Sequence, residues 1–155
     1  MPHPPYVAVV GPGSADDPSL LDAAHEAGRL LAERGCVVVT GGLGGVMAAA
    51  AAGAAEAGGT AVGLLPGEDR SLASEGHSIV IPTGMGEMRN ALLVRSVDAV
   101  LAVGGSWGTL SEIALAARTG VPVFAVRSWE LPGSEVNACA DVADAIERMA
   151  ALLQG

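Results

Sequence analysis

The chain has 155 residues, of which 50% are hydrophobic and only 3% aromatic, and it carries a formal net charge of −9. This length predicts one domain, residues 1–155, with a full hydrophobic core. The negative charge argues against nonspecific binding to nucleic acid or to anionic membranes. All eight basic residues are arginines, which excludes Schiff-base catalysis, pyridoxal phosphate attachment and a P-loop lysine.

The predicted elements alternate between apolar runs and helical patterns. Strands are predicted over 6–10, 36–40, 60–65, 79–81, 98–103 and 121–126, the last of these closing the sheet. Helices are predicted over 18–34, 46–57, 87–96 and 137–153, and a further helix follows Gly104–Glu112 and ends near Thr119. Asp17 and Pro18 form a typical helix start, with the capping residue followed by proline at the first helical position.

Nearly continuous apolar strands between helices predict an α/β, Rossmann-like, doubly wound parallel sheet with helices on both faces. In this architecture ligands bind at the carboxyl ends of the strands. Three glycine clusters follow predicted strands, at 11–13, 41–45 and 104–108. We therefore expect them to converge on one crevice.

The third cluster is the most informative. Gly104-Gly105-Ser106-Trp107-Gly108-Thr109-Leu110-Ser111-Glu112 joins an apolar run to a helix. Glycines let backbone N–H groups approach a ligand, and a helix N-terminus adds partial positive charge. The segment predicts a phosphate site with a carboxylate, Glu112, beside it.

A dinucleotide site is excluded by the first cluster. Gly11 and Gly13 match the start of the G-x-G-x-x-G pattern, but Asp16 stands where the third glycine belongs. The second strand ends in Thr40 rather than in the acidic residue that holds an adenosine ribose.

Two charged residues allow both a functional and a structural interpretation. Thr109 and Glu112 have the spacing of a capping box, in which each side chain satisfies the other's backbone N–H. Arg89 is predicted near a helix start, where the helix dipole disfavours a cation, so it either meets an anion or carboxylate or is an exposed helical arginine. Arg95 could pair with Asp98 or Glu87.

The remaining aromatic and histidine residues are less informative. Trp107 could stack on a base or shield the pocket, and Trp129 is expected to pack or to form an interface. The polar segment 66–78 is predicted to be a surface loop, and its histidine, His77, to be solvated like His25.

Targeting and redox signals are weak. Cys36 and Cys139 lie far apart without metal-ligand spacing, a pattern of reducing compartments. The start of the chain does not resemble a signal peptide, and no apolar stretch is long enough to span a membrane. We expect a cytoplasmic protein that binds no metal, cofactor, nucleic acid or membrane. The small residues of 46–57 could also pack against a symmetry mate, which predicts a homodimer or homotetramer.

With these residues in view, the chain resembles the LOG family of cytokinin-riboside monophosphate phosphoribohydrolases, and more closely its short bacterial branch related to molybdenum-cofactor carrier proteins. The resemblance covers residues 7–126. Gly105, Gly108, Thr109 and Glu112 match the family's P-G-G-x-G-T-x-x-E motif. Further matches are Gly13 with Ser14, the turn residues Gly41, Gly42, Gly45 and Met47, and Arg89, Arg95 and Asp98.

The resemblance implies catalytic roles for Arg89 and Glu112. With the loop residues, it leads us to expect that a 5′-phosphate or nucleotide is bound by Gly13, Ser14, Gly41, Gly42, Gly45, Met47, Asn90, Gly105, Ser106, Trp107, Gly108 and Thr109. The chain departs from the family at Thr40, Asn90, Gly104 and Ser106, where the family has glycine, lysine, proline and glycine.

Two functions follow. The first is hydrolysis of the N-glycosidic bond of a nucleoside 5′-monophosphate, giving a free base and ribose 5-phosphate. A carboxylate would stabilise the oxocarbenium-like state of that reaction or activate water. The alternative is a non-catalytic binder or carrier of a phosphorylated ligand, either molybdenum cofactor or a nucleotide.

Overall fold

The structure is a computed structural model that describes residues 3–154. Its centre is one seven-stranded sheet in the order β4-β3-β2-β1-β5-β6-β7. All six neighbouring pairs are parallel. The strands are β1 (Tyr6–Val10), β2 (Val37–Thr40), β3 (Ala61–Leu65), β4 (Ile79–Pro82), β5 (Ala99–Val103), β6 (Val123–Val126) and β7 (Val136–Ala138).

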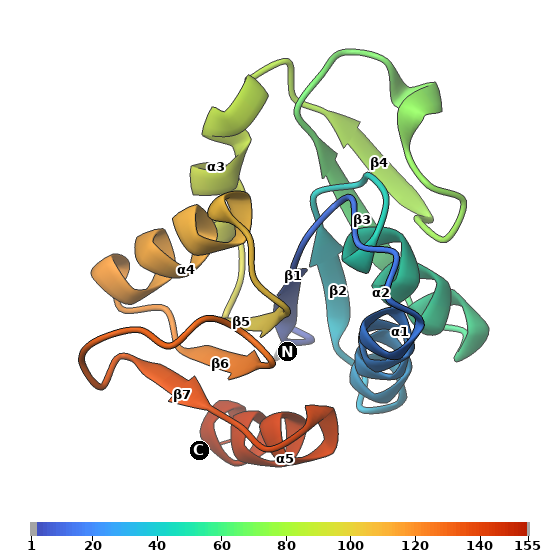
Figure 1. The fold of residues 1–155 in the computed structure, drawn as a ribbon. Helices are drawn as coiled ribbons and strands as arrows, with labels where there is room; N and C mark the ends of the chain where they lie inside the picture. The colour runs from blue at the N-terminus through green and yellow to red at the C-terminus, as the bar shows by residue number, and fades with distance from the viewer. Residues whose placement is uncertain (1–2, 155) are drawn as a thin grey trace.

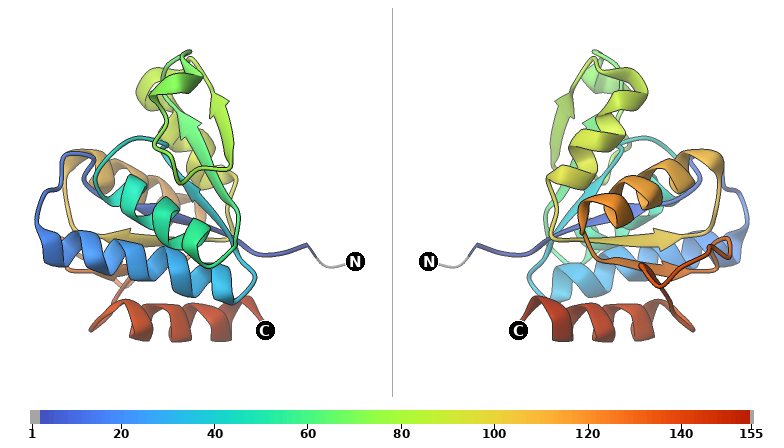
Figure 2. Two further views of the ribbon diagram at one scale, coloured as in Figure 1. Left: turned by 90° about the vertical axis from the view of Figure 1, so that its right-hand side faces the viewer. Right: turned by 90° about the vertical axis from the view of Figure 1, so that its left-hand side faces the viewer.

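Five α-helices cover both faces of the sheet, as Figure 1 shows. They are α1 (Pro18–Glu33), α2 (Val46–Glu56), α3 (Arg89–Arg95), α4 (Trp107–Thr119) and α5 (Val142–Leu153). Helices α1, α2 and α5 lie on one side and α3 and α4 on the other, an arrangement that the views in Figure 2 also show. The predicted α/β doubly wound parallel sheet is therefore confirmed.

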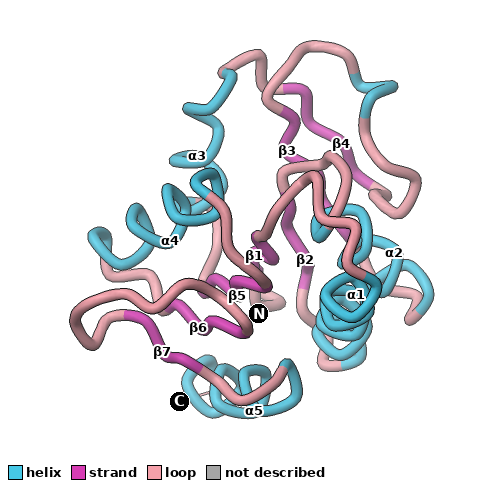
Figure 3. Tube along the Cα trace, in the orientation of Figure 1, coloured by secondary structure: helices cyan, strands magenta, loops and turns pink. Residues whose placement is uncertain are grey.

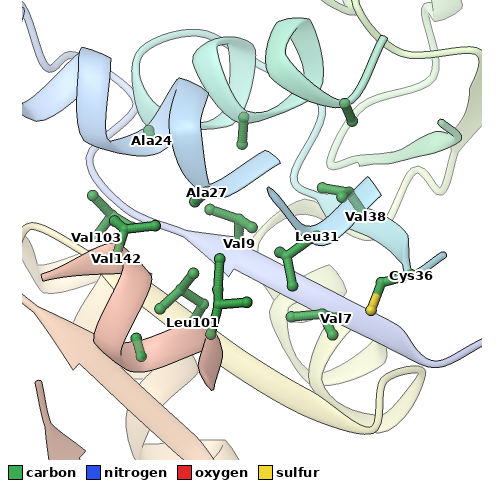
Figure 4. Close-up of a cluster of buried hydrophobic side chains, with 14 of the residues drawn as sticks. Val7, Val9, Ala24, Ala27, Leu31, Cys36, Val38, Leu101, Val103 and Val142 are labelled. Carbon is green, nitrogen blue, oxygen red and sulfur yellow. The ribbon is translucent and has the colours of Figure 1, made fainter. Parts of the chain in front are cut away.

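A separate hydrophobic cluster fills the space on each face. On the α1/α2/α5 face, Val7, Val9 and Leu101 of the central strands meet Leu31 of α1 and Val142 of α5 (Figure 4). On the opposite face the cluster includes Leu93 of α3 and Ile113 of α4. Successive residues of a strand point to opposite faces, so central strands buried on both sides must be apolar throughout. Every residue of β5 is buried.

The small residues of α2 are used within the chain. A Cβ at Gly28 of α1 would lie 1.9 Å from the carbonyl oxygen of Ala50, and a Cβ at Gly53 would lie 1.9 Å from that of His25. Glycine at these positions lets α1 and α2 approach closely. The small-residue pattern of α2 thus serves packing against α1, and the homodimer or homotetramer remains a prediction without its support.

The start of α1 is as predicted: Asp17 accepts a hydrogen bond from the Ser19 N–H at 3.0 Å, and Pro18 is the first helical residue. The C-terminal part differs from the prediction. Strand 121–126 is not the last, because the three-residue β7 pairs with β6. The closing helix begins at Val142 rather than near 137, because Asp141 caps it by accepting from the Asp144 N–H at 2.8 Å.

The predicted helix over 87–96 is divided into a 3₁₀ turn, Gly86–Met88, followed by α3. The connection from β3 to β4 is mostly loop, as Figure 3 shows, with a 3₁₀ turn at Arg70–Leu72. Among residues 3–154, no helix is long and apolar enough to cross a membrane.

Candidate phosphate-binding crevice

A polar cavity of about 130 Å³ opens at the carboxyl ends of the central strands. The strand order reverses between β1 and β5, and such a switch point is where open α/β sheets bind ligands. Besides Arg89 and Glu112, the predicted site residues that line the cavity are Gly13, Gly41, Met47, Asn90, Ser106, Gly108 and Thr109. All three glycine clusters contribute, so the convergence expected from the sequence is present.

Helix α4 points its N-terminus at this cavity. Ser106 is its capping residue, and Ser106 Oγ accepts from the Thr109 N–H at 3.2 Å and contacts Thr109 Oγ1 at 2.9 Å. Helix geometry leaves the N–H groups of Trp107 and Gly108 without intrahelical acceptors. These groups and the helix dipole make the end of α4 suited to an anion.

The capping-box interpretation of Glu112 is wrong. Because α4 already begins at Trp107, Thr109 lies inside the first turn and Glu112 lies one turn further along. The cap that the sequence suggested at Thr109 is made by Ser106, three residues earlier. The Glu112 carboxylate is therefore not needed to begin the helix.

Glycines bring the backbone of two other loops to the cavity wall. A Cβ at Gly41 would lie 2.4 Å from Nη2 of Arg89 and 2.7 Å from Sδ of Met47. A Cβ at Gly11 would lie 2.3 Å from the carbonyl oxygen of Val103. Gly11 lines the cavity as its place in the first glycine cluster led us to expect, and Val9 and Val10 of β1 line it without having been predicted.

Arg89 is buried, at 9% exposure, so the exposed-arginine alternative is wrong. Its Nε donates to the carbonyl oxygen of Leu64 at 2.9 Å, its Nη2 to that of Gly41 at 3.3 Å, and its Nη1 to Oδ1 of Asn90. A guanidinium has five N–H donors, so two remain for a ligand. Asn90 in turn donates to Ser111 Oγ of α4 at 3.1 Å, which connects α3 to α4.

Glu112 is the carboxylate of the cavity and is 8% exposed. Burial raises its pKa to about 7, while the charge of Arg89 acts in the opposite direction. Near neutral pH the carboxyl group therefore exists in both protonation states. Burial also lowers the pKa of Arg89, against the charge of Glu112, but a guanidinium remains protonated throughout the accessible pH range.

Five predicted site residues do not line the cavity: Ser14, Gly42, Gly45, Gly105 and Trp107. Gly42 and Gly45 have φ of +82° and +59° and shape the turn before α2. Gly105 lies against Trp129, whose Cδ1 would be 2.6 Å from an added Cβ. Trp107 is 79% exposed and meets Trp129 edge-on, with ring centroids 4.9 Å apart.

Other polar residues have partners that the sequence did not reveal. His25 contacts Glu56 at 2.9 Å. Asp98 accepts from the Tyr6 N–H at 2.8 Å, and no ion pair found within residues 3–154 includes Arg95. The same part of the chain contains no group of three His, Cys, Asp or Glu side chains that could hold a metal ion.

His77 is the largest departure from the predicted picture. It is only 8% exposed, and its Nε2 lies 2.5 Å from Oγ1 of the fully buried Thr40. The expectation of a solvated histidine in a surface loop is wrong. A polar residue, Thr40, at the end of an apolar strand was the available signal, because a buried hydroxyl requires a hydrogen-bond partner.

The chain is similar to proteins of known structure. It is 34% identical to a molybdenum cofactor binding protein of the phototrophic bacterium Rippkaea orientalis, with a TM-score of 0.91 over 97% of this chain and 98% of that one. It is 36% identical to a molybdenum cofactor carrier protein of Chlamydomonas reinhardtii, with a TM-score of 0.89 over 99% and 100%.

An uncharacterized protein of Archaeoglobus fulgidus is 40% identical over 142 residues, which are 86% of this chain and 93% of that protein. The sequence profile of the SLOG cluster4 family matches residues 4–151, nearly the whole chain. The chain with this crevice therefore belongs to the SLOG cluster4 family.

Proposed function

We propose that the crevice binds a phosphorylated small molecule and that the protein is a binder or carrier of molybdenum cofactor. The observation that carries the proposal is the combination, in one cavity, of the α4 N-terminus, glycine-lined backbone and an arginine with two unused donors. The two cofactor-binding relatives, similar over nearly their whole length, support the choice of ligand.

The charges around the cavity fit a phosphate monoester. The protein's net charge of −9 repels anions at long range, so affinity must come from local donors. Backbone N–H groups at a helix start and a charge-assisted bond from Arg89 supply such donors. Protonation of Glu112, whose pKa is near neutrality, removes the one carboxylate that lines the cavity within the described residues.

A second candidate is hydrolysis of a nucleoside 5′-monophosphate. The observation that favours it is Glu112 itself, buried beside Arg89 with a pKa of about 7. A group with this pKa can act as a general base or acid at physiological pH. In this reaction water adds to C1′ of the ribose while the C–N bond breaks, and the base leaves with a proton.

One experiment separates the two functions. Purified protein is mixed with molybdenum cofactor released from a denatured molybdoenzyme, and retained cofactor is measured after desalting. In parallel, AMP, GMP, CMP and UMP are incubated with the protein, and free base is measured by chromatography. Retention without base release supports the carrier, whereas multiple turnovers of base release support the hydrolase. Neither retention nor release would overturn both proposals.

Two variants locate the binding. Arg89→Met is expected to weaken retention about tenfold or more, because a charge-assisted hydrogen bond contributes about 1.5–3 kcal/mol. Arg118→Met is the matched control, since Arg118 is exposed in the last turn of α4. Equal losses in the two variants would place the ligand elsewhere.

A further inference from the structure

The ring of His77 is buried and does not line the crevice. It packs over Gly63 of β3, where an added Cβ would lie 3.0 Å from its Cδ2. Gly63 is the register partner of Thr40 in β2. Paired residues of parallel strands face the same side of the sheet, so the glycine leaves room for the imidazole beside the Thr40 hydroxyl.

The hydrogen bonds around this ring favour one protonation pattern. His77 Nδ1 lies 3.0 Å from Ser74 Oγ and 3.2 Å from the carbonyl oxygen of Ser74. The hydroxyl can donate or accept, but the carbonyl oxygen can only accept, so a proton on Nδ1 is the arrangement that satisfies both contacts. Nε2 is then an acceptor and receives the Thr40 hydroxyl hydrogen across 2.5 Å. Thr40 Oγ1 itself accepts from the Gly42 N–H at 2.9 Å. Each donor in this series of hydrogen bonds has an acceptor when the imidazole is neutral.

The loop that carries His77 also holds the other side of Gly42. The Ser74 N–H donates to the carbonyl oxygen of Gly42 at 3.0 Å. Both polar backbone groups of Gly42, a residue with φ of +82°, are therefore fixed from the 74–77 segment, one directly and one through Thr40. The preceding residue, Gly41, provides the carbonyl oxygen that Arg89 contacts.

We propose that His77 is a positioning residue for the ligand site: through Thr40 it fixes the Gly41–Gly42 turn and so determines where the Arg89 guanidinium meets the ligand's phosphate. The effect on the ligand rests on the proposed function. The effect on the turn and on Arg89 does not, and it can be measured in the free protein.

Protonation of His77 would break this arrangement. The groups that face the ring are uncharged: Thr40 from β2, Gly63 from β3 and Ser74 from its own loop. Its titratable sequence neighbour, Glu75, is exposed. Burial lowers the pKa of His77 below the usual 6.5, so the ring is neutral at pH 7. A second ring proton would turn Nε2 into a donor and leave the Thr40 hydroxyl hydrogen without an acceptor.

The first test uses NMR of the protein without ligand. The ¹⁵N shifts of the His77 ring should report the Nδ1–H tautomer. The Gly42 amide should titrate below pH 6.5 with the same midpoint as that ring, and the Arg89 Nε–H signal should shift with them. An Nε2–H tautomer, or Gly42 and Arg89 signals that do not follow His77, would overturn the proposal.

The second test compares variants with molybdenum cofactor as the probe. Thr40→Val removes the hydroxyl at constant shape and should weaken retention about tenfold, whereas Thr40→Ser keeps the hydroxyl and should stay within about twofold. Val142→Ala, a remote core variant of α5, controls for lost stability. If Thr40→Val does not fold, His77→Gln, whose amide oxygen can accept from Thr40, is compared with His77→Asn, which cannot reach it.

The outcomes of the two tests separate the proposals. Wild-type protein that fails to retain the cofactor contradicts the proposed function, while the free-protein NMR still decides the role of His77. Wild-type retention with equal retention by Thr40→Val and Thr40→Ser contradicts the positioning role.

Discussion

Nη2 of Arg89 in α3 donates to the carbonyl oxygen of Gly41, 48 positions earlier in the chain, at 3.3 Å. This bond joins the turn between β2 and α2 to helix α3, which lies on the opposite face of the sheet from α2. It gives a buried cation a fixed place in the crevice, with its other bonds made to Leu64 and Asn90.

Gly41→Ala should therefore displace Arg89 without unfolding the protein. The new methyl group would overlap Nη2 and Cζ of Arg89 and Sδ of Met47, which are side-chain atoms and not backbone. We expect ligand affinity to fall about tenfold, the effect of one weakened charge-assisted hydrogen bond, with a small change in Tm. The control is Gly67→Ala, where an added Cβ meets nothing within 4 Å. Unchanged affinity in Gly41→Ala would contradict the placement of Arg89 at the ligand.

Gly108→Ala should raise the stability of the protein while it lowers the affinity for the ligand. An added Cβ here would meet only Ser106 Oγ, at 3.9 Å, so the folded protein accommodates it. Replacing a helical glycine by alanine should raise the free energy of unfolding by up to about 0.5–1 kcal/mol. If a phosphate approaches the Gly108 N–H, the methyl group should hinder it and affinity should fall. Thermal unfolding and cofactor retention measure the two effects, and stronger binding by the variant would argue against a phosphate at the start of α4.

The raised pKa of Glu112 predicts a pH-dependent stability. Between pH 4.5 and about 7 the unfolded chain loses the Glu112 proton while the folded protein keeps it. Stability from this group is complete below pH 4.5 and is lost as pH rises through 7. Glu112→Gln should remove the effect. The free energy of unfolding of Glu112→Gln minus that of the wild type should rise by roughly 2–4 kcal/mol between pH 4.5 and 8.

Urea unfolding of both proteins at several pH values measures this difference. His77 contributes in the opposite direction at low pH, but it does so in both proteins, so its contribution cancels in the difference. The exposed Glu26→Gln in α1 is the matched control. A stability difference that does not change with pH would show that Glu112 has an ordinary pKa.

Glu112→Gln also separates the two candidate functions. A neutral amide cannot repel a phosphate, so a carrier should retain its ligand at least as well as wild type, with the largest gain above pH 7. A hydrolase should lose base release, because the amide cannot accept a proton or stabilise positive charge on the ribose. Retention and base release measured on one preparation decide between them.

Much of this site could be predicted from the sequence because its signals are local. Each glycine cluster directly follows an apolar strand, and parallel strands end at one edge of the sheet, so Gly13, Gly41 and Gly108 converge. The start of α4 was harder, because Ser106 and Thr109 are both plausible caps. Gly104, with φ of +81°, turns the chain after β5 and lets Ser106 cap the helix.

The features that were missed depend on distant partners. His77 is buried because Gly63 and Thr40, from two other segments, form a place for its ring. No pattern within the polar loop reveals this. Strand β7 has three residues, too few for a hydrophobic period to be recognised. It forms because it can pair with β6, and the Asn137 side chain donates to the Val123 carbonyl oxygen at 3.0 Å.

The most direct test of the account is a crystal structure of the protein with bound molybdenum cofactor, or with AMP if the cofactor is not retained. We predict the phosphate at the start of α4, within hydrogen-bond distance of the Gly108 N–H and of a free N–H of Arg89, with Glu112 facing the ligand. A phosphate bound outside this crevice, with Arg89 and the Gly41 turn unchanged, would contradict it.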